Sequence, residues 1–178
     1  GKVLTPAAVN ADKASGGVLA RALKFSRFAG KAGELLDVVA PDASGVSRLV
    51  LAGLGKPSAL DGTALEGIAA KIVARLESLG ETAATFEVEV PKGAKIRGGE
   101  AAAHLAFGAR LRGYSFDKYR TRNLDEYKRH LQTLAVATAD AAAARKAWAG
   151  LSAVADGVLF ARDLVNEPAE TIYPQSLA

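Results

Sequence analysis

The stretch from Leu151 to Val165 constrains the fold most, because a helix built from it is apolar on two sides. The first apolar face carries Leu151, Val154, Val158 and Val165, and the second carries Leu159, Phe160 and Leu164. A helix with two apolar faces must be covered twice. We therefore expect a strut of roughly 24 Å, at 1.5 Å per residue, that packs against two bodies.

Upstream of this stretch, short apolar runs alternate with amphipathic helical patterns. The patterns predict helices over 10–28, 61–79, 100–112 and 140–148, and strands over 35–39, 48–54, 84–90 and 131–138. Such alternation is typical of a layered α/β domain. The predicted fold class is thus α/β, a layered mixed sheet flanked by helices and followed by a long C-terminal helix. A boundary near Gly150 divides a domain at 1–149 from a second unit at 150–178.

The helix predicted over 61–79 has the most regular pattern. Asp61 or Thr63 is placed to cap its first turn, and Gly80 stands where a helix C-cap glycine belongs. Its apolar residues recur at spacings of three and four, which gives one buried stripe. The stripe consists of Leu65, Ile68, Ile72, Leu76 and Leu79.

Two of the strand patterns predict different environments. The run over 48–54 is almost continuously apolar and bounded by glycine, which predicts a central strand covered on both faces. The run over 84–90 alternates, with Phe86 and Val88 on one side and Glu87 and Glu89 on the other. This alternation predicts a strand with one solvated face.

Composition excludes several kinds of site. The 178 residues include no cysteine, which excludes disulfides and thiolate metal sites, and no apolar run approaches the roughly 20 residues that cross a bilayer. His104 and His130 stand apart from other ligand residues, so we predict no zinc site. The turn over 53–58 lacks the spacing of a phosphate-binding loop, and no serine occupies a G-x-S-x-G elbow. The net charge of +4 lies in the range that keeps an ordinary small domain in solution.

Three segments carry a more specific pattern. The run A-R-D-L-V-N-E-P-A covers 161–169 and precedes Tyr173-Pro174, the run G-A-R-L-R-G-Y-S-F-D-K-Y-R covers 108–120, and a strand over 49–56 closes in G-L-G-K. Together they resemble the leucyl aminopeptidase family, the cytosolic aminopeptidases that use two metal ions. The resemblance implies the family's N-terminal domain, with a macro-domain-like fold, joined to the catalytic domain by the 161–169 run. Macro domains can bind ADP-ribose, so this ligand remains open.

The resemblance implies an enzyme as the parent protein, a metallo-aminopeptidase that hydrolyses N-terminal residues from peptides in the cytoplasm with two zinc or manganese ions. It also implies a hexamer, in which this domain is peripheral and contributes to subunit contacts and active-site access. The family's signature N-T-D-A-E-G-R-L is absent here. We therefore predict no catalytic residue, metal ligand or cofactor in this chain, and no activity for it alone. Pro174 suits the first turn of a helix that the chain does not complete, so we expect a catalytic domain to follow.

The 161–169 run supplies the residues expected at the junction between the two domains. Asp163 and Glu167 share one helical face at i and i+4, and we predict solvation or contact with the catalytic domain for both rather than metal binding. The complete set of junction residues is Arg162, Asp163, Asn166, Glu167 and Pro168.

Residues 110–130 support an alternative function. Their basic side chains interleave with Tyr114, Phe116, Tyr119 and Tyr127, and such a pattern can bind nucleic acid by neutralising phosphates and stacking on bases. The competing interpretation is an aromatic-anchored loop whose arginines pair with nearby acids. The basic residues concerned are Arg110, Arg112, Lys118, Arg120, Arg122, Lys128 and Arg129.

Overall fold

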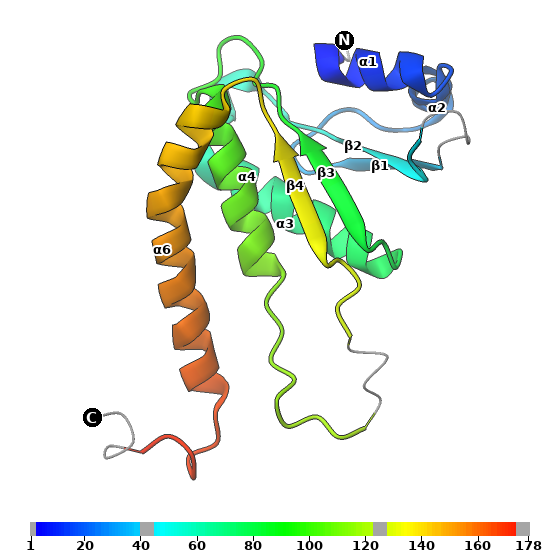
Figure 1. Ribbon diagram of the computed structural model, residues 1–178. Helices are drawn as coiled ribbons and strands as arrows, with labels where there is room; N and C mark the ends of the chain where they lie inside the picture. Colours follow the sequence, from blue (N-terminus) through cyan, green and yellow to red (C-terminus); the bar gives the residue numbers. More distant parts are fainter. Residues whose placement is uncertain (1–2, 40–44, 123–127, 174–178) are drawn as a thin grey trace.

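The computed structural model describes residues 3–39, 45–122 and 128–173. These residues form a mixed α/β fold with small sheets flanked by helices, which confirms the predicted class (Figure 1). The elements are α1 (Pro6–Ala14), α2 (Val18–Phe25), β1 (Leu35–Val39), β2 (Arg48–Ala52), η2 (Pro57–Ala59), α3 (Gly62–Ser78), β3 (Ala83–Glu87), α4 (Gly98–Arg112), β4 (Thr133–Ala137) and α6 (Ala141–Asn166).

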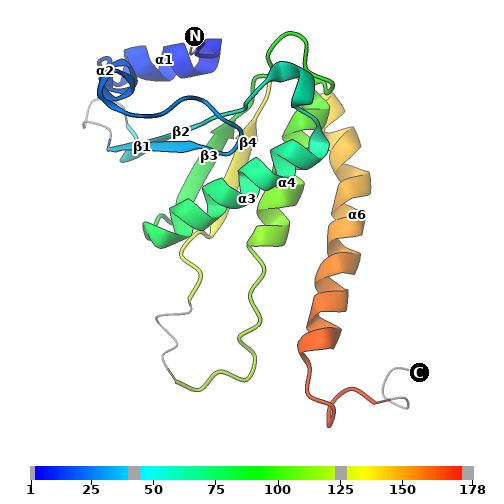
Figure 2. The ribbon, with the colours of Figure 1, turned by 180° about the vertical axis from the view of Figure 1, so that it is seen from behind.

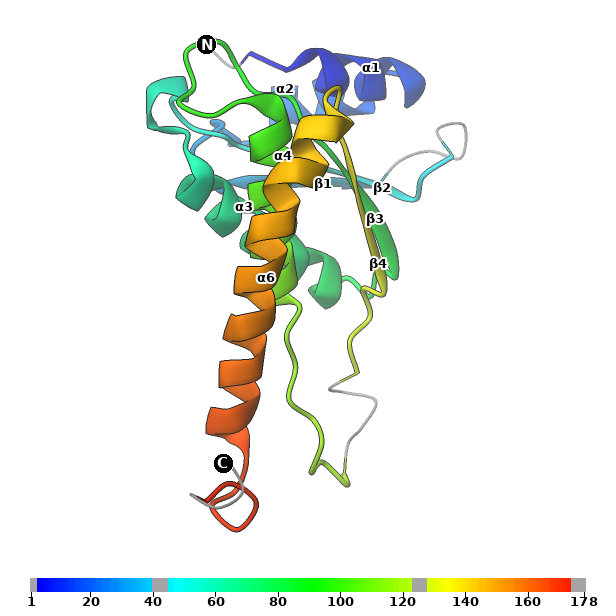
Figure 3. The same ribbon diagram turned by 60° about the vertical axis from the view of Figure 1, so that its left-hand side comes forward.

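The described strands pair as two separate two-stranded sheets. β1 and β2 are antiparallel, with Leu35 opposite Ala52, whereas β3 and β4 are parallel, with Ala83 beside Thr133. The prediction of a central strand over 48–54 is wrong for the described residues, because β2 pairs with β1 alone. Both faces of β2 are nevertheless partly covered, because α3 lies on one side of the hairpin while α1 and α2 lie on the other (Figure 3).

The single helix predicted over 10–28 is wrong, because the chain forms two short helices there. α1 begins after Thr5, whose side chain accepts a hydrogen bond from the Ala8 amide, and it ends at Ala14. Gly16 and Gly17 then adopt φ values of 67° and 78°, which lie in the left-handed region that interrupts a right-handed helix. α2 therefore starts afresh at Val18 and packs Leu19 inward.

The core lies between α3, α4 and one face of the β3–β4 sheet (Figure 2). The predicted signals of α3 are confirmed, since the Asp61 side chain caps Ala64 and Gly80 has a φ of 73°. α3 and α4 approach closely at Gly108, where a Cβ atom would lie 2.4 Å from the Glu66 carbonyl oxygen. The buried core cluster is Leu60, Leu65, Ile68, Ala69, Val73, Leu76, Phe86, Ile96, Ala101, Leu105 and Ala109.

The β3–β4 sheet has one covered face and one solvated face, as the alternation over 84–90 predicts. Phe86 is buried against α3 and α4, while Thr85 and Glu87 are exposed on the other side. β4 repeats the pattern, with Leu134 and Val136 directed toward the same core. β3 ends at Glu87, three residues earlier than the predicted range of 84–90.

α6 is one continuous helix from Ala141 to Asn166, so the two helices predicted on either side of Gly150 are wrong. Asp140 caps its first turn, and the helix continues through Gly150, where an added Cβ atom would meet no neighbouring atom within 4 Å. The helix packs along α4 and then extends beyond it, away from both sheets (Figures 1 and 3). None of the helices in the described residues is long and apolar enough to cross a membrane.

Candidate functional site

The loop after α4, residues 113–122, meets the last turns of α6. The Tyr114 hydroxyl donates to Asp163 Oδ1 at 2.8 Å and accepts from Asn166 Nδ2 at 3.1 Å. Contact with the carboxylate disfavours ionisation of the phenol. Two causes raise the pKa of Tyr114: partial removal from water is the larger, and the hydrogen bond to Asp163 is the next. One tyrosine thus joins two turns of α6 to the loop.

Arg162 closes the end of α4 against α6. Its Nη1 donates to the Leu111 carbonyl oxygen at 3.0 Å, and its guanidinium carbon lies 4.0 Å from the centre of the Tyr114 ring. Carbonyls of the last helical turn lack partners within the helix, so this contact satisfies one of them. The stacked ring adds a cation–π contact.

Glu167, the C-cap of α6, holds the far end of the loop. Lys118 Nζ lies 2.7 Å from its Oε1, the Tyr119 hydroxyl donates to its Oε2, and the side chain is 11% exposed. The hydrogen bonds from Lys118 and then Tyr119 lower the pKa of Glu167, and the same contact raises the pKa of Lys118. Phe116 packs on Tyr119 with ring centres 5.9 Å apart. We call this set the junction cluster: Tyr114, Lys118, Tyr119, Arg162, Asp163, Asn166 and Glu167.

Four of the five predicted junction residues belong to the junction cluster, and their described contacts are made within the chain. Both carboxylate oxygens of Glu167 are engaged within the chain, and solvation or contact with the catalytic domain stays a prediction for Asp163 and Glu167. Pro168 follows, and its carbonyl accepts from the Thr171 amide at 2.8 Å to close a turn. Pro174, with its predicted helix start, lies outside the described residues.

The basic residues of 110–130 divide into two groups. Arg110 binds Asp156, and Arg129 donates to the Tyr114 carbonyl oxygen at 2.6 Å and lies 3.9 Å from Glu77. With Lys118, these side chains support the interpretation of an aromatic-anchored loop with paired cations. The Arg112, Arg122 and Lys128 side chains are exposed and form no hydrogen bond or ion pair with a described residue. Arg120 is exposed but has a partner, and Tyr127 lies outside the described residues.

The lower half of α6 presents apolar side chains to solvent. Val165 is 85% exposed, and Val154 and Val158 are exposed on the same face of the helix. Phe160, on the second apolar face, is 63% exposed, whereas Ala155 is fully buried. Of the two bodies expected around this helix, the described residues provide one, the α4 side.

Neither histidine nor the glycine turn forms a catalytic site in the described residues. His104 Nδ1 lies 2.7 Å from Glu66 Oε1 and joins α4 to α3. The Gly53 and Gly55 amides donate to the Glu34 and Gly30 carbonyl oxygens, so neither points toward a phosphate. No three His, Asp or Glu side chains converge as metal ligands anywhere in the described residues.

Comparison with known proteins shows which family this chain resembles. Residues 1–123 match the family described as "Cytosol aminopeptidase family, N-terminal domain". A probable cytosol aminopeptidase of Caulobacter vibrioides is 40% identical over 178 residues, which is all of this chain and 35% of that protein. A probable cytosol aminopeptidase of Rhodopseudomonas palustris is 42% identical over 158 residues, 89% of this chain and 31% of that protein. The chain spans about a third of the length of these curated relatives.

Solved structures share the fold. A mutant of tomato leucine aminopeptidase superposes with a TM-score of 0.79 at 23% identity, over 99% of this chain and 34% of that one. The bottromycin maturation enzyme BotP in complex with Mn superposes with a TM-score of 0.67 at 27% identity, over 85% of this chain and 30% of that one. The superposition on the tomato protein extends over α6, so the long helix belongs to the shared fold.

Proposed function

Because the chain belongs to the cytosol aminopeptidase family and matches its N-terminal domain, we propose that it is the non-catalytic N-terminal domain of a metal-dependent aminopeptidase. The complete protein hydrolyses N-terminal residues from peptides in the cytoplasm. This chain contributes a docking surface for the catalytic portion. The observation that carries the proposal is the pair of exposed apolar faces of α6, with Val154, Val158 and Val165 on one and Phe160 on the other, beside the junction cluster.

The exposed faces fit a second body because of where they lie. Phe160 and Val165 stand on a helix whose other side is already packed on α4, so a covering body must approach from solvent. Large apolar side chains exposed close together mark interaction surfaces in soluble proteins. The junction cluster holds the helix end and the loop in one geometry, which preorganises the surface for binding. The linker unit starts near Gly150, within α6, and leads into the catalytic unit that follows the helix.

The two divalent ions, zinc or manganese, belong to the catalytic portion. When bound, such ions polarise the scissile carbonyl and lower the pKa of the attacking water. The described residues of this chain do not fit a two-metal centre, because no three ligand side chains converge. In this proposal the described residues supply a docking surface for the catalytic portion rather than metal ligands.

The first experiment concerns catalysis. The purified 178-residue chain should release no p-nitroaniline from leucine p-nitroanilide, with or without manganese. Turnover that depends on manganese and co-purifies with this chain would contradict the assignment of a non-catalytic domain.

The second experiment concerns docking. We expect a chimera, in which this chain replaces the matching N-terminal third of the Caulobacter relative, to be an active aminopeptidase. Phe160→Asp should disrupt docking and lower the activity of the chimera severalfold, because it places a charge in an apolar interface. The matched control is Phe25→Asp, since Phe25 is 83% exposed on α2, away from α6. If the two substitutions lowered the activity equally, α6 would be excluded as the docking surface.

The domain's second role is in the assembly of a hexamer and in access to its active sites. Light scattering should give a hexameric mass for the active chimera. A fully active chimera that stays monomeric would contradict this role.

Binding of nucleic acid is the alternative function, favoured by the exposed side chains of Arg112, Arg122 and Lys128, which form no hydrogen bond or ion pair with a described residue. A gel-shift titration at two salt concentrations should show binding that weakens steeply with salt and is lost in Arg122→Ala plus Lys128→Ala. The matched control is Arg145→Ala plus Lys146→Ala, which removes two exposed cations from α6. Absence of a shift at micromolar protein would end this alternative, and absence of heat on calorimetric titration would do the same for ADP-ribose.

A further inference from the structure

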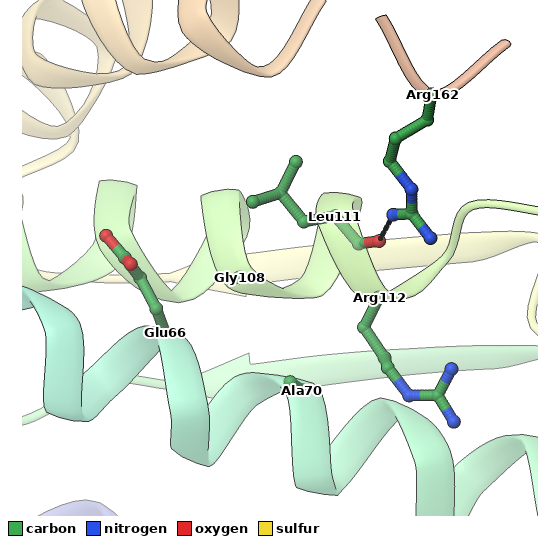
Figure 4. Close-up of a pocket in the computed structure, with 6 residues that line it drawn as sticks. All are labelled: Glu66, Ala70, Gly108, Leu111, Arg112 and Arg162. Carbon is green, nitrogen blue, oxygen red and sulfur yellow. Dashed lines mark hydrogen bonds between the residues drawn. The ribbon is translucent and has the colours of Figure 1, made fainter. Parts of the chain in front are cut away.

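An open cavity of about 310 Å³ lies where α3, α4 and α6 meet (Figure 4). Its volume is at the lower end of the range for small-molecule sites. Arg162 is the member of the junction cluster that lines it. The lining residues are Glu66, Ala70, Gly108, Leu111, Arg112 and Arg162.

One end of the cavity carries two guanidinium groups. The Arg112 side chain has no hydrogen bond or ion pair with a described residue, and Arg162 uses one N–H on the Leu111 carbonyl oxygen. Figure 4 shows both groups at the same end. An arginine offers five N–H donors in a fork that matches a carboxylate. This end therefore attracts an anionic group.

The other end carries a carboxylate with one oxygen available. Glu66 Oε1 contacts His104 Nδ1 at 2.7 Å, whereas Oε2 has no hydrogen bond to a described residue. Between the two ends, Ala70 and Leu111 give the wall an apolar character, and Gly108 has no side chain to obstruct the floor. The cavity is thus negative at one end, positive at the other and apolar between them.

The spacing of the two ends selects the length of the ligand. The Glu66 carboxylate contacts His104, which precedes Arg112 by eight residues, or about 12 Å along α4. An extended dipeptide separates its ammonium and carboxylate groups by roughly 7 Å, and a hydrogen bond of about 2.8 Å at each end brings the span to roughly 12–13 Å. We propose that this cavity binds a dipeptide, with its carboxylate between Arg112 and Arg162 and its ammonium on Glu66 Oε2. A free amino acid is too short to reach both ends.

The test is a titration of the ¹⁵N-labelled 178-residue chain with alanyl-alanine, followed by amide chemical shifts. We expect saturable shifts around residues 66–70 and 108–112, with a dissociation constant of about 1 mM or below. Absence of saturable shifts at 66–70 and 108–112 up to about 20 mM dipeptide would overturn the proposal. Because the readout is binding by this chain and not hydrolysis, such a failure would leave the proposed function untouched.

Substitutions at the two ends of the cavity test which side chains bind the charged groups of the dipeptide. Arg112→Gln and Glu66→Gln should each weaken binding at least about fivefold, because each removes a charge-assisted contact. Arg122→Gln is the matched control, since it removes an exposed arginine outside the cavity and should leave binding unchanged. Unfolding midpoints of the variants establish that each is folded. Equal affinity of Arg112→Gln and the unmodified chain would contradict the proposed carboxylate position.

Ligand analogues separate a dipeptide site from a general anion site. N-acetyl-alanyl-alanine lacks the ammonium, alanyl-alanine amide lacks the carboxylate, and both should bind at least about fivefold more weakly. Free alanine should bind more weakly than alanyl-alanine, because a single amino acid is too short to reach both ends of the cavity. Inorganic phosphate that matched the dipeptide in affinity at the same residues would show a general anion site and overturn the assignment.

Discussion

The α3–α4 core and the junction cluster are held together by different kinds of contact. α4 buries eight of its 15 residues, mostly alanines and other small side chains, so two helices approach closely and exclude water. Of the 26 residues of α6, Ala155 is the one that is buried. The lower part of α6 is instead fixed by polar side chains that reach across from the loop. The core is complete in itself, whereas the junction cluster stabilises a surface that is still open.

The largest effect should come from truncation in the core. Leu65→Ala should lower the free energy of unfolding by about 3 kcal/mol, because it removes apolar contacts and leaves a cavity at a site that is 2% exposed. Val165→Ala, at a site that is 85% exposed, should change it by less than about 0.5 kcal/mol. Urea unfolding followed by circular dichroism measures both. A large loss for Val165→Ala would break the comparison, since it would mean that the α6 face is already buried in solution.

Glycine substitutions should sharpen the comparison with effects of opposite sign. Gly108→Ala should cost about 1–3 kcal/mol, because the new Cβ would meet the Glu66 backbone and force α3 and α4 apart. Gly157→Ala should add about 0.5–1 kcal/mol, since a Cβ atom at this α6 glycine would meet no neighbour within 4 Å and alanine is the better helix former. The same unfolding experiment decides. A loss of stability in Gly157→Ala would show that something covers α6 at that point.

The smallest effect should be local and dependent on pH. Lys118 and Tyr119 lower the pKa of Glu167 below its ordinary value of 4.5, so the contact stabilises the folded loop above that pH. Its contribution should disappear as the pH falls through the lowered pKa and the carboxylate gains a proton. Amide hydrogen exchange of 114–122 should therefore accelerate in acid, while that of α3 stays slow.

The matched variant for the pH effect is Glu167→Gln. It should show the fast exchange of the loop already at neutral pH and lose the acid transition. An acid transition that persists in Glu167→Gln would assign the effect to another group.

The helices with clear caps and periodicity were predictable from the sequence. Asp61, Gly80 and the stripe through Leu65 and Ile68 define α3 by local rules, because capping and periodicity act within a few residues. The pairing of β2 was not predictable in this way. An apolar run such as Leu49 to Leu51 shows that both faces are covered, without showing whether strands or helices cover them.

The two segments that form the candidate site were predictable from the sequence, but their contacts were not. The runs at 108–120 and 161–169 stand out in the sequence, and the structure brings them together in the junction cluster. The individual partners were not predictable, because Tyr114 and Asp163 are 49 residues apart and no local pattern encodes such a contact. The same holds for the cavity between Glu66 and Arg112, whose residues lie on different helices.

The sequence by itself determined the α/β class, the caps of α3, the solvated face of β3 and an apolar excess on the last helix. These features depend on backbone geometry and side-chain periodicity, which extend over a few residues. Only the tertiary structure decided which face of α6 is packed, which cations are paired and where opposite charges meet across a cavity. Those outcomes depend on distances between segments far apart in the chain, and such distances are set when the core packs.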